Sequence, residues 1–145
     1  VLEHVVEPKK VVDEIYRVLK KNGIVYAETP FMQQVHEGAY DFTRFTVLGH
    51  RYLFTNFSSI LIGANKGTEI VLAWAIKYFF WSIFRNIKLA SFIGIAFQLI
   101  LRPFSILTSK KSLYDCSSGV YFMGKKKMKF KLSHKGVIKL YKGHF

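Results

Sequence analysis

Hydrophobic and polar positions in the first thirty residues follow two different periods. Apolar residues recur at the spacing of one helical face over residues 11–19, Pro8 suits a first helical turn, and Gly23 follows as a helix stop. Residues 24–30 are rich in strand-forming side chains and end at a proline, which cannot continue a central ladder. Residues 1–2 have the pattern of a strand end. A strand, a covering helix and a second strand predict a βαβ crossover in a parallel sheet with a right-handed connection.

The pattern beyond this crossover predicts one more helix and strand and then a long apolar segment. Residues 47–57 are predicted to form a helix and residues 58–64 a strand. Residues 68–105 are too apolar for an ordinary loop and are predicted to form helices. Near the end of the chain, Ser133 is expected to cap a short helix over residues 134–141.

The apolar segment 68–105 is predicted to lie on a membrane surface rather than to span the bilayer. Its longest charge-free run, 89–101, has thirteen residues, whereas a spanning helix needs about 20. Basic residues that recur every eleven positions would form one stripe on an otherwise apolar helix: Lys66, Lys77 and Lys88, with Arg85 close by. Such a stripe suits anionic headgroups, with Trp74 and Trp81 near the boundary. An apolar lid or a dimer contact covered by protein is the alternative.

Charge is distributed unevenly along the chain. Residues 1–65 hold seven basic and seven acidic residues, so the second half carries the entire net charge of +13. This asymmetry predicts a polyanionic neighbour, a membrane surface or nucleic acid, for the second half. From Lys125 on there are eight lysines and no arginine, so base reading is not expected, and a merely solvated tail is the alternative. The single cysteine, Cys116, excludes an intramolecular disulfide and fits a cytoplasmic protein.

Polar and aromatic side chains gather in the segment that follows residues 24–30. The run "TPFMQQVHEGAYDFTRFT" contains, within nine residues, His36, Glu37, Tyr40, Asp41 and Arg44. Parallel sheets bind their ligands outside the carboxyl ends of the strands. That edge also receives the segment after the first predicted strand, so we expect Glu3 and His4 to lie there as well.

Three stretches of the chain resemble one enzyme family. The stretch "VLEHVVEPKKVVDEIYRVLKKNGIVYAETPF" is similar to class I S-adenosylmethionine-dependent methyltransferases, from the end of their fourth strand through the fifth. The stretch "YDFTRFTVLGHRYLF" resembles the part that follows in members acting in cell-surface glycan and lipid pathways, and "CSSGVYFMGKK" resembles the final antiparallel strand. The resemblance implies an α/β fold, namely a partial Rossmann-like methyltransferase sheet (strands 4/5 to 7) with an apolar helical insertion.

The resemblance implies S-adenosyl-L-methionine as the cofactor, with Leu2, Glu3 and His4 on the cofactor side of the cleft. Glu3 and His4 have an alternative use as caps of the following helix. The glycine-rich cofactor loop of the family has no counterpart here, because no G-x-G occurs among the ten glycines. We therefore expect this sequence to begin inside or just after the fourth strand, and the 145 residues alone to bind the cofactor very weakly and to be inactive.

The resemblance also assigns the acceptor side of the cleft to the loop after residues 24–30. Tyr40 and Phe31 would contact the acceptor, a small molecule or a glycan- or lipid-linked group. His36 or Asp41 would be the base that takes the acceptor's proton, and Arg44 would orient an anionic acceptor. Asp41 and Arg44 could equally form only a local ion pair that braces the loop.

Two further sets of polar residues are expected to have no catalytic role. His36 and Glu37 suggest a metal, but no His or Cys residues are paired at ligand spacing, so we expect no metal site. His50 and Arg51 are expected to be solvated helix residues.

The sequence therefore predicts three parts: half of a methyltransferase domain over 1–65, an apolar helical insertion over 66–108, and the last strand with a basic tail over 109–145. The predicted function is methyl transfer from S-adenosylmethionine to an oxygen or nitrogen acceptor, in the cytoplasm or at the inner face of the membrane. The alternative is a non-catalytic peripheral membrane-binding protein with an α/β scaffold.

Overall fold

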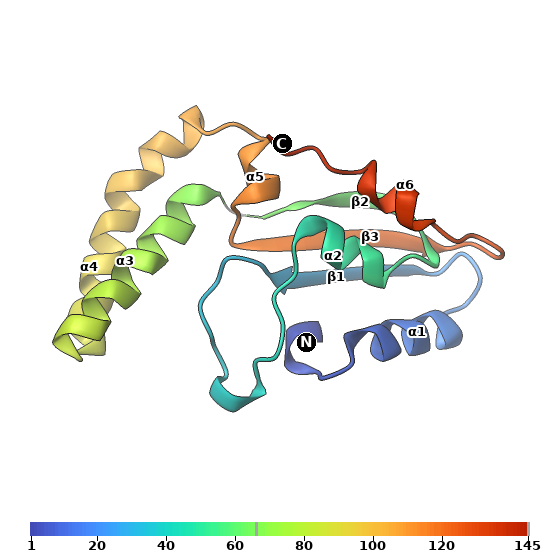
Figure 1. Ribbon diagram of the computed structural model, residues 1–145, viewed down its shortest axis with the longest axis horizontal. Coiled ribbons are helices and arrows are strands. Elements are labelled where there is room, and N and C mark those ends of the chain that lie inside the picture. Colours follow the sequence, from blue (N-terminus) through green and yellow to red (C-terminus); the bar gives the residue numbers. More distant parts are fainter. Residues whose placement is uncertain (66, 145) are drawn as a thin grey trace.

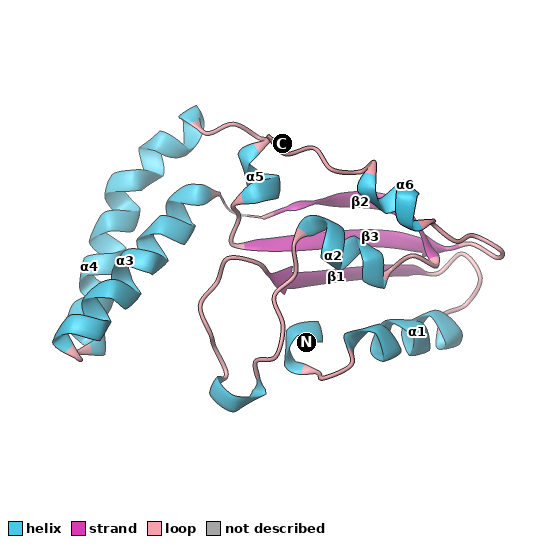
Figure 2. Cartoon of the chain, viewed as in Figure 1, coloured by secondary structure: helices cyan, strands magenta, loops and turns pink. Residues whose placement is uncertain are grey.

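A three-stranded sheet forms the centre of the protein (Figures 1 and 2). The computed structural model describes residues 1–65 and 67–144. Its strands are β1 (Ile24–Pro30), β2 (Phe57–Ala64) and β3 (Gly119–Lys126), in the order β1-β3-β2. β3 is antiparallel to both neighbours, so β1 and β2 run in the same direction. The protein is thus an α/β chain with an antiparallel sheet.

The predicted parallel crossover is not found among the described residues. Leu2–His4 form a single 3-10 turn (η1) where the sequence predicted a strand end, and β1 pairs with β3 rather than with a preceding strand. The other elements of this region are found at their predicted places: α1 spans Pro8–Val18, and β1 and β2 lie where predicted. The helix α2 spans Val47–Leu53, which is shorter than the predicted 47–57. Periodicity predicts each element well but not its partner in the sheet.

One face of the sheet is covered by α1 and α2 and carries the core. Phe122 of β3 stacks on Phe54 at 4.7 Å between ring centroids, and Tyr16 of α1 meets Phe57 edge to face at 5.1 Å. The buried core also includes Leu2, Val12, Val25, Phe45, Val47, Leu53 and Val120. The opposite face is open, with exposed apolar side chains such as Tyr26.

Lys126 joins the end of β3 to the end of α1. Its ammonium donates to the carbonyls of Tyr16 and Leu19, the latter at 2.7 Å, and lies 4.7 Å from the centre of the Tyr16 ring. A cation at this place satisfies carbonyls that have no partner inside the helix. The helix consequently ends at Val18, before the stop predicted at Gly23.

His50 and Arg51 of α2 are buried, which corrects the prediction that they are solvated. Each is 1% exposed. The Arg51 guanidinium donates to the carbonyls of Phe54 and Phe57 and lies 4.8 Å from the centre of the Phe122 ring. Burial lowers the pKa of Arg51 to about 10. Arg51 thus ties the turn between α2 and β2 to the sheet, and His50 packs beside the rings of Phe45 and Phe54. A periodicity that counts only apolar residues could not predict their burial.

Two apolar helices, α3 (Thr68–Phe84) and α4 (Ile87–Leu101), form a hairpin that projects from the sheet (Figure 1). The hairpin corrects the predicted single stripe of basic residues. Arg85 has a left-handed φ of 49°, which ends α3, and the Asn86 side chain then caps α4 by accepting from the backbone of Lys88 and Leu89. Lys77 and Lys88 therefore lie on different helices, and Lys66 lies outside the described residues.

The seam between α3 and α4 is made of small side chains. Ala73 and Ala90 are buried there, and a Cβ added at Gly94 would lie 2.8 Å from the Cβ of Lys77. Small residues four apart, such as Ala90 and Gly94, let helix backbones approach closely. Lys77 consequently lays its aliphatic stem against this seam.

The helical stretch Ile87–Leu107, which joins α4 to the 3-10 helix η3 (Arg102–Leu107), has 21 residues and a mean hydropathy of 1.7. Only 11% of its apolar window is buried inside the protein. Length and composition alone would allow it to cross a membrane, although the charge-free run inside it is shorter.

The chain returns to the sheet through α5 (Ser112–Asp115) and ends with α6 (His134–Ile138) packed near α2. The predicted cap is confirmed, because the Ser133 hydroxyl accepts from the Gly136 backbone at 3.1 Å. The helix is shorter than predicted and ends at Ile138.

The burial of His50 predicts a pH-dependent stability. Burial lowers its pKa to about 4, with the Glu3 carboxylate partly opposing, against 6.5 in the unfolded chain. Below pH 6.5, His50 becomes protonated in the unfolded state but stays neutral in the folded state. The free energy of unfolding therefore falls with pH until about pH 4, where the folded state is protonated as well, and then levels off. The loss should reach about 3 kcal/mol.

Urea unfolding at a series of pH values measures this loss. His50→Phe should flatten the curve between pH 6.5 and 4, whereas the exposed control His134→Ala should leave it unchanged. A His50→Phe curve that keeps the full slope would contradict the assignment.

Candidate active site

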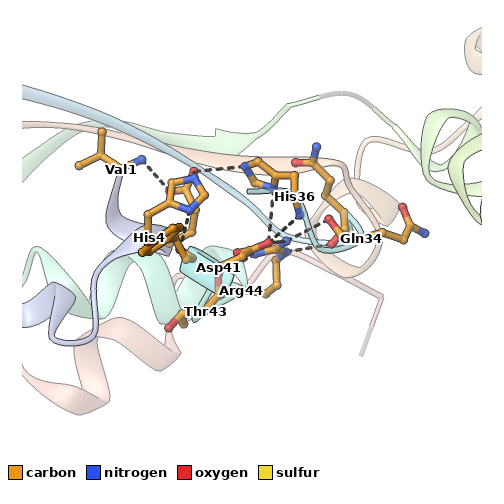
Figure 3. A network of polar contacts seen from close by, with 10 residues as sticks. Val1, His4, Gln34, His36, Asp41, Thr43 and Arg44 are labelled. Carbon is orange, nitrogen blue, oxygen red and sulfur yellow. Dashed lines mark hydrogen bonds and ion pairs between the residues drawn. The ribbon is translucent and has the colours of Figure 1, made fainter. Parts of the chain in front are cut away.

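The loop 31–46 after β1 lies against η1, as the shared sheet edge predicts. The Glu3 carbonyl accepts from the backbone of Phe42 at 2.9 Å and of Thr43 at 3.3 Å. The predicted functional side chains Glu3, His4, His36, Asp41 and Arg44 are brought into one polar network (Figure 3). Residues more than thirty positions apart in the sequence are thus in direct contact.

The strongest bond in this network is the ion pair between Asp41 and Arg44. The guanidinium grips both carboxylate oxygens and also donates to the carbonyls of Gln33 (2.8 Å), Gln34 (3.0 Å) and Thr43 (3.1 Å). All five N–H donors of the arginine therefore have a partner within the loop. This arrangement is the bracing ion pair that the sequence left open, and it leaves Arg44 no spare donor for an acceptor molecule.

Asp41 is held as an anion by the same bonds. Its side chain is fully enclosed. Hydrogen bonds from Arg44, opposed by burial and helped by the His36 backbone, hold the pKa of Asp41 well below its usual range. A carboxylate this acidic is a weak base near neutral pH, so the geometry favours a structural role for Asp41.

His36 lies between two carboxylates. Its backbone N–H donates to Asp41 at 2.9 Å, its Nδ1 is 3.5 Å from Asp41 Oδ2, and its Nε2 is 3.9 Å from Glu3 Oε1. The side chain is 34% exposed. Among the three predicted catalytic residues, His36 combines partial solvent access with a ring that is not locked in a salt bridge.

Glu3 and His4 stand on η1 and face the loop rather than the following helix. The Glu3 side chain is buried, and its Oε1 lies 3.5 Å from His4 Nε2. The helix that follows is capped by neither residue, since its first position is preceded by Glu7. The alternative role as helix caps is therefore not what the structure shows.

The other predicted contact residues lie apart from this cluster. Leu2 is buried in the core, and Phe31 packs against that core and lines a separate cavity of about 290 Å³ next to Tyr114. The Tyr40 backbone carbonyl lies 2.9 Å from His4 Nδ1, while its side chain is 71% exposed. Contacts of Phe31 and Tyr40 with an acceptor remain predictions.

A polar pocket of about 560 Å³ opens where β1 and β2 end. Its lining includes Glu3, Glu28, Thr29, Gln33, Asn65 and Trp74. Asn65 donates to the Glu28 carboxylate, and Thr29 carries a buried hydroxyl that has no hydrogen-bond partner. Gly119 makes room here, because a Cβ on it would lie 2.9 Å from the Thr29 carbonyl.

Most of the residues that line this pocket were not predicted from the sequence as site residues. Glu28 and Thr29 were counted only as strand residues, and Trp74 was expected near a membrane boundary. The available signal was position, since polar residues that close a strand stand at the sheet edge where ligands bind.

Comparison with known families gives one match, at the start of the chain. Residues 1–27 match the methyltransferase domain. The match covers η1, α1 and the first half of β1, and it supports a class I S-adenosylmethionine-dependent methyltransferase domain at the N-terminal end of this chain. Comparison with curated proteins and comparison with solved structures each give no match.

The methyltransferase match reaches Glu3 and His4 but not the loop of His36. It supports a methyltransferase function in general, and the matched family generally uses S-adenosylmethionine. The match adds no information on residues 28–145, so what is known of the remaining site comes from the structure.

The bonds of Arg44 predict a large stability effect. Arg44→Ala leaves a buried carboxylate unpaired and should lower the free energy of unfolding by about 1–3 kcal/mol. The same variant should also speed hydrogen exchange of the His36 backbone amide, which donates a hydrogen bond to Asp41. The matched control is Arg17→Ala, which breaks an exposed pair with Glu14 at the same i, i+3 spacing and should change stability little.

Denaturant unfolding and amide exchange measure both effects. The swapped double variant, Asp41→Arg with Arg44→Asp, should recover part of the stability if bracing is the role of the pair. Equal effects of Arg44→Ala and Arg17→Ala would show that the bonds of Arg44 contribute nothing.

Proposed function

We propose that this chain is the C-terminal half of a class I methyltransferase domain that transfers a methyl group from S-adenosylmethionine to an oxygen or nitrogen acceptor. The observation that carries the proposal is the polar pocket at the ends of β1 and β2, bordered by Glu3 of the matched segment. Pockets at this edge are where α/β sheets bind their ligands.

The strand directions support the same assignment. β1 and β2 share one direction, as two strands of a Rossmann-like sheet do, and β3 enters antiparallel between them. A final antiparallel strand is what the resemblance of residues 116–126 implies. β1 is an edge strand in the described chain, and a Rossmann-like sheet would continue on that side.

Within this function, we assign to His36 the role of the base that takes the proton from the acceptor. It is partly open to solvent, and the enclosed Asp41 holds its backbone and faces its Nδ1. Methyl transfer is an in-line displacement that depends on positioning of donor and acceptor and on a base for the acceptor's proton. Asp41 and Arg44 act through His36 by fixing the loop.

The proposal predicts a division of labour that kinetics can measure in the complete gene product. His36→Ala should lower kcat for methyl transfer by about 100-fold or more, with little change in cofactor affinity, because a base is lost. Asp41→Asn should lower activity in proportion to its loss of stability. Transfer of the labelled methyl group from S-adenosylmethionine is the readout.

The exposed Tyr52→Ala serves as the control and should leave kcat unchanged. A His36→Ala enzyme with normal kcat would remove His36 from the chemistry, and a gene product that neither binds S-adenosylmethionine nor transfers its methyl group would refute the function.

A second function is favoured by the surface of the α3–α4 hairpin. Large apolar side chains are exposed over its length, among them Phe79, Trp81, Phe92, Ile95 and Leu99. No acidic residue occurs between Glu69 and Asp115 in the sequence, while Arg85, Lys88 and Arg102 are exposed. An apolar surface rimmed by cations fits a bilayer with anionic headgroups.

We accordingly propose that the hairpin attaches the protein to the inner face of a membrane. Attachment would place the methyl-transfer site near lipid-linked acceptors, which fits an acceptor from glycan or lipid metabolism. A scaffold without catalysis would use the same surface, and the activity measurement above separates the two.

Flotation with liposomes tests the attachment. The chain should float with anionic vesicles, and Arg85→Glu with Lys88→Glu should lower the bound fraction several-fold, more at low than at high salt. The control, Lys20→Glu with Lys21→Glu, makes the same change of charge at exposed sites beyond α1. Lys77 is left unchanged because its stem packs in the helix seam.

Two results would overturn this proposal. Equal flotation of both double variants would exclude the hairpin cations as the contact. Retention in the membrane after washing with high salt and alkali would show that the hairpin spans the bilayer.

A further inference from the structure

We propose that Glu3, His4 and His36 form a binding site for a divalent transition metal ion of the zinc type. One ligand atom from each of these residues lies within 4.8 Å of the other two. Two imidazoles and one carboxylate form the ligand set of open, catalytic zinc sites. The inference goes beyond methyl transfer and does not require it, since binding of an ion can be measured without cofactor or acceptor.

The two histidines present the same nitrogen to the carboxylate. His4 Nε2 lies 3.5 Å and His36 Nε2 3.9 Å from the same oxygen, Glu3 Oε1. The two rings meet edge to face with centroids 4.9 Å apart (Figure 3). Three donor atoms thus converge on one small volume rather than pairing in a line.

The opposite nitrogen of each ring faces an oxygen that can orient it. His4 Nδ1 is 2.9 Å from the Tyr40 carbonyl, and His36 Nδ1 is 3.5 Å from Asp41 Oδ2. Metal-bound histidines usually donate their second N–H to a backbone carbonyl or a carboxylate, which fixes the tautomer. His36 Nδ1 is buried and makes no hydrogen bond. With an ion on Nε2, the ring proton would be on Nδ1, and that N–H could donate a hydrogen bond to Asp41.

The distances match an ion with little rearrangement. Two ligands of one tetrahedral zinc ion lie about 3.3 Å apart, given bonds of about 2.0–2.1 Å. The two separations from Glu3 Oε1, 3.5 and 3.9 Å, are close to this value, and all three ligand atoms lie within 4.8 Å of one another. Binding of an ion would therefore draw the two imidazoles toward each other.

The surroundings suit a cation. The Glu3 side chain is buried, and its Oε1 faces the imidazoles of both His4 and His36. Asp41 adds a second enclosed carboxylate behind His36. Glu3 also lines the polar pocket, so the fourth ligand would come from that pocket, as water or as an acceptor oxygen.

An ion at this place would change the role of His36 from proton acceptor to ligand. A hydroxyl bound to a transition metal is more acidic and would give its proton to solvent water in the pocket instead of to His36, so the ion would favour an oxygen acceptor. This last step rests on the proposed function, whereas the binding of the ion does not.

Titration of the complete gene product with Co²⁺ and Zn²⁺ tests the site. We expect one Co²⁺ per chain with the visible absorption bands of four-coordinate cobalt, and displacement of Co²⁺ by Zn²⁺. His4→Ala and His36→Ala should each weaken binding by about 100-fold or more. Glu3→Gln, which keeps the shape of the side chain, should weaken it as well, and Asp41→Asn should cost about 10–100-fold through His36.

The matched control is His134→Ala, which removes an exposed histidine on α6 and should leave the affinity unchanged. Folding of each variant is checked by circular dichroism, and in the wild-type chain the ring protons of His4 and His36 should shift on addition of Zn²⁺. The site is refuted if those two rings do not respond, or if His134→Ala weakens binding as much as His4→Ala.

Failure of methyl transfer with intact Zn²⁺ binding would reject the proposed function and keep the metal site. Intact methyl transfer without Zn²⁺ binding would reject the metal site and keep the proposed function.

Discussion

The pairing of β3 with both other strands is the constraint on which this structure depends. β1 and β2 have no hydrogen bonds to each other, and their common direction exists because each is antiparallel to the same strand. Phe122 of β3 then stacks on Phe54 and lies beneath Arg51, so the strand also holds α2 to the sheet. Once this strand is in place, the ends of β1 and β2 share an edge, and the polar pocket forms between them.

The candidate site depends on the sheet edge in turn. Loop 31–46 buries Phe45 and packs Phe31 on the core but leaves most of its other apolar side chains exposed. Polar bonds hold the rest of the loop, chiefly the five donors of Arg44 and the carbonyl of Glu3. Such bonds are rigid only while all are made, because each buried partner left alone costs free energy. The loop can therefore present His36 at a fixed place while the imidazole itself stays partly open.

The elements that the sequence predicted well are those that depend on neighbours along the chain. Apolar spacing predicted α1 and the strands β1 and β2, and the capping preference of Ser133 predicted the start of α6. The positional rule for sheet edges brought Glu3 and His36 to the same place, although the parallel pairing behind that argument was absent. Contacts between distant segments could not be predicted, such as that of Arg51 with the Phe122 ring. The other partners of Arg51 are nearby backbone carbonyls, which every residue carries, so they left no signal in the sequence. The convergence of His4 and His36 was equally hidden, because ligand spacing counts neighbours in sequence and these two rings are thirty-two positions apart.

The place of the hairpin between β2 and β3 has a consequence for how the protein is made. β1 must wait for residues 119–126, nearly a hundred positions later, before it can pair with β3. During synthesis the apolar helices α3 and α4 leave the ribosome first, while the sheet that anchors them is still incomplete. Contacts this distant in sequence form slowly, and apolar surface exposed meanwhile favours aggregation. A nascent chain of this kind would benefit from an early partner that covers the apolar surface of its hairpin.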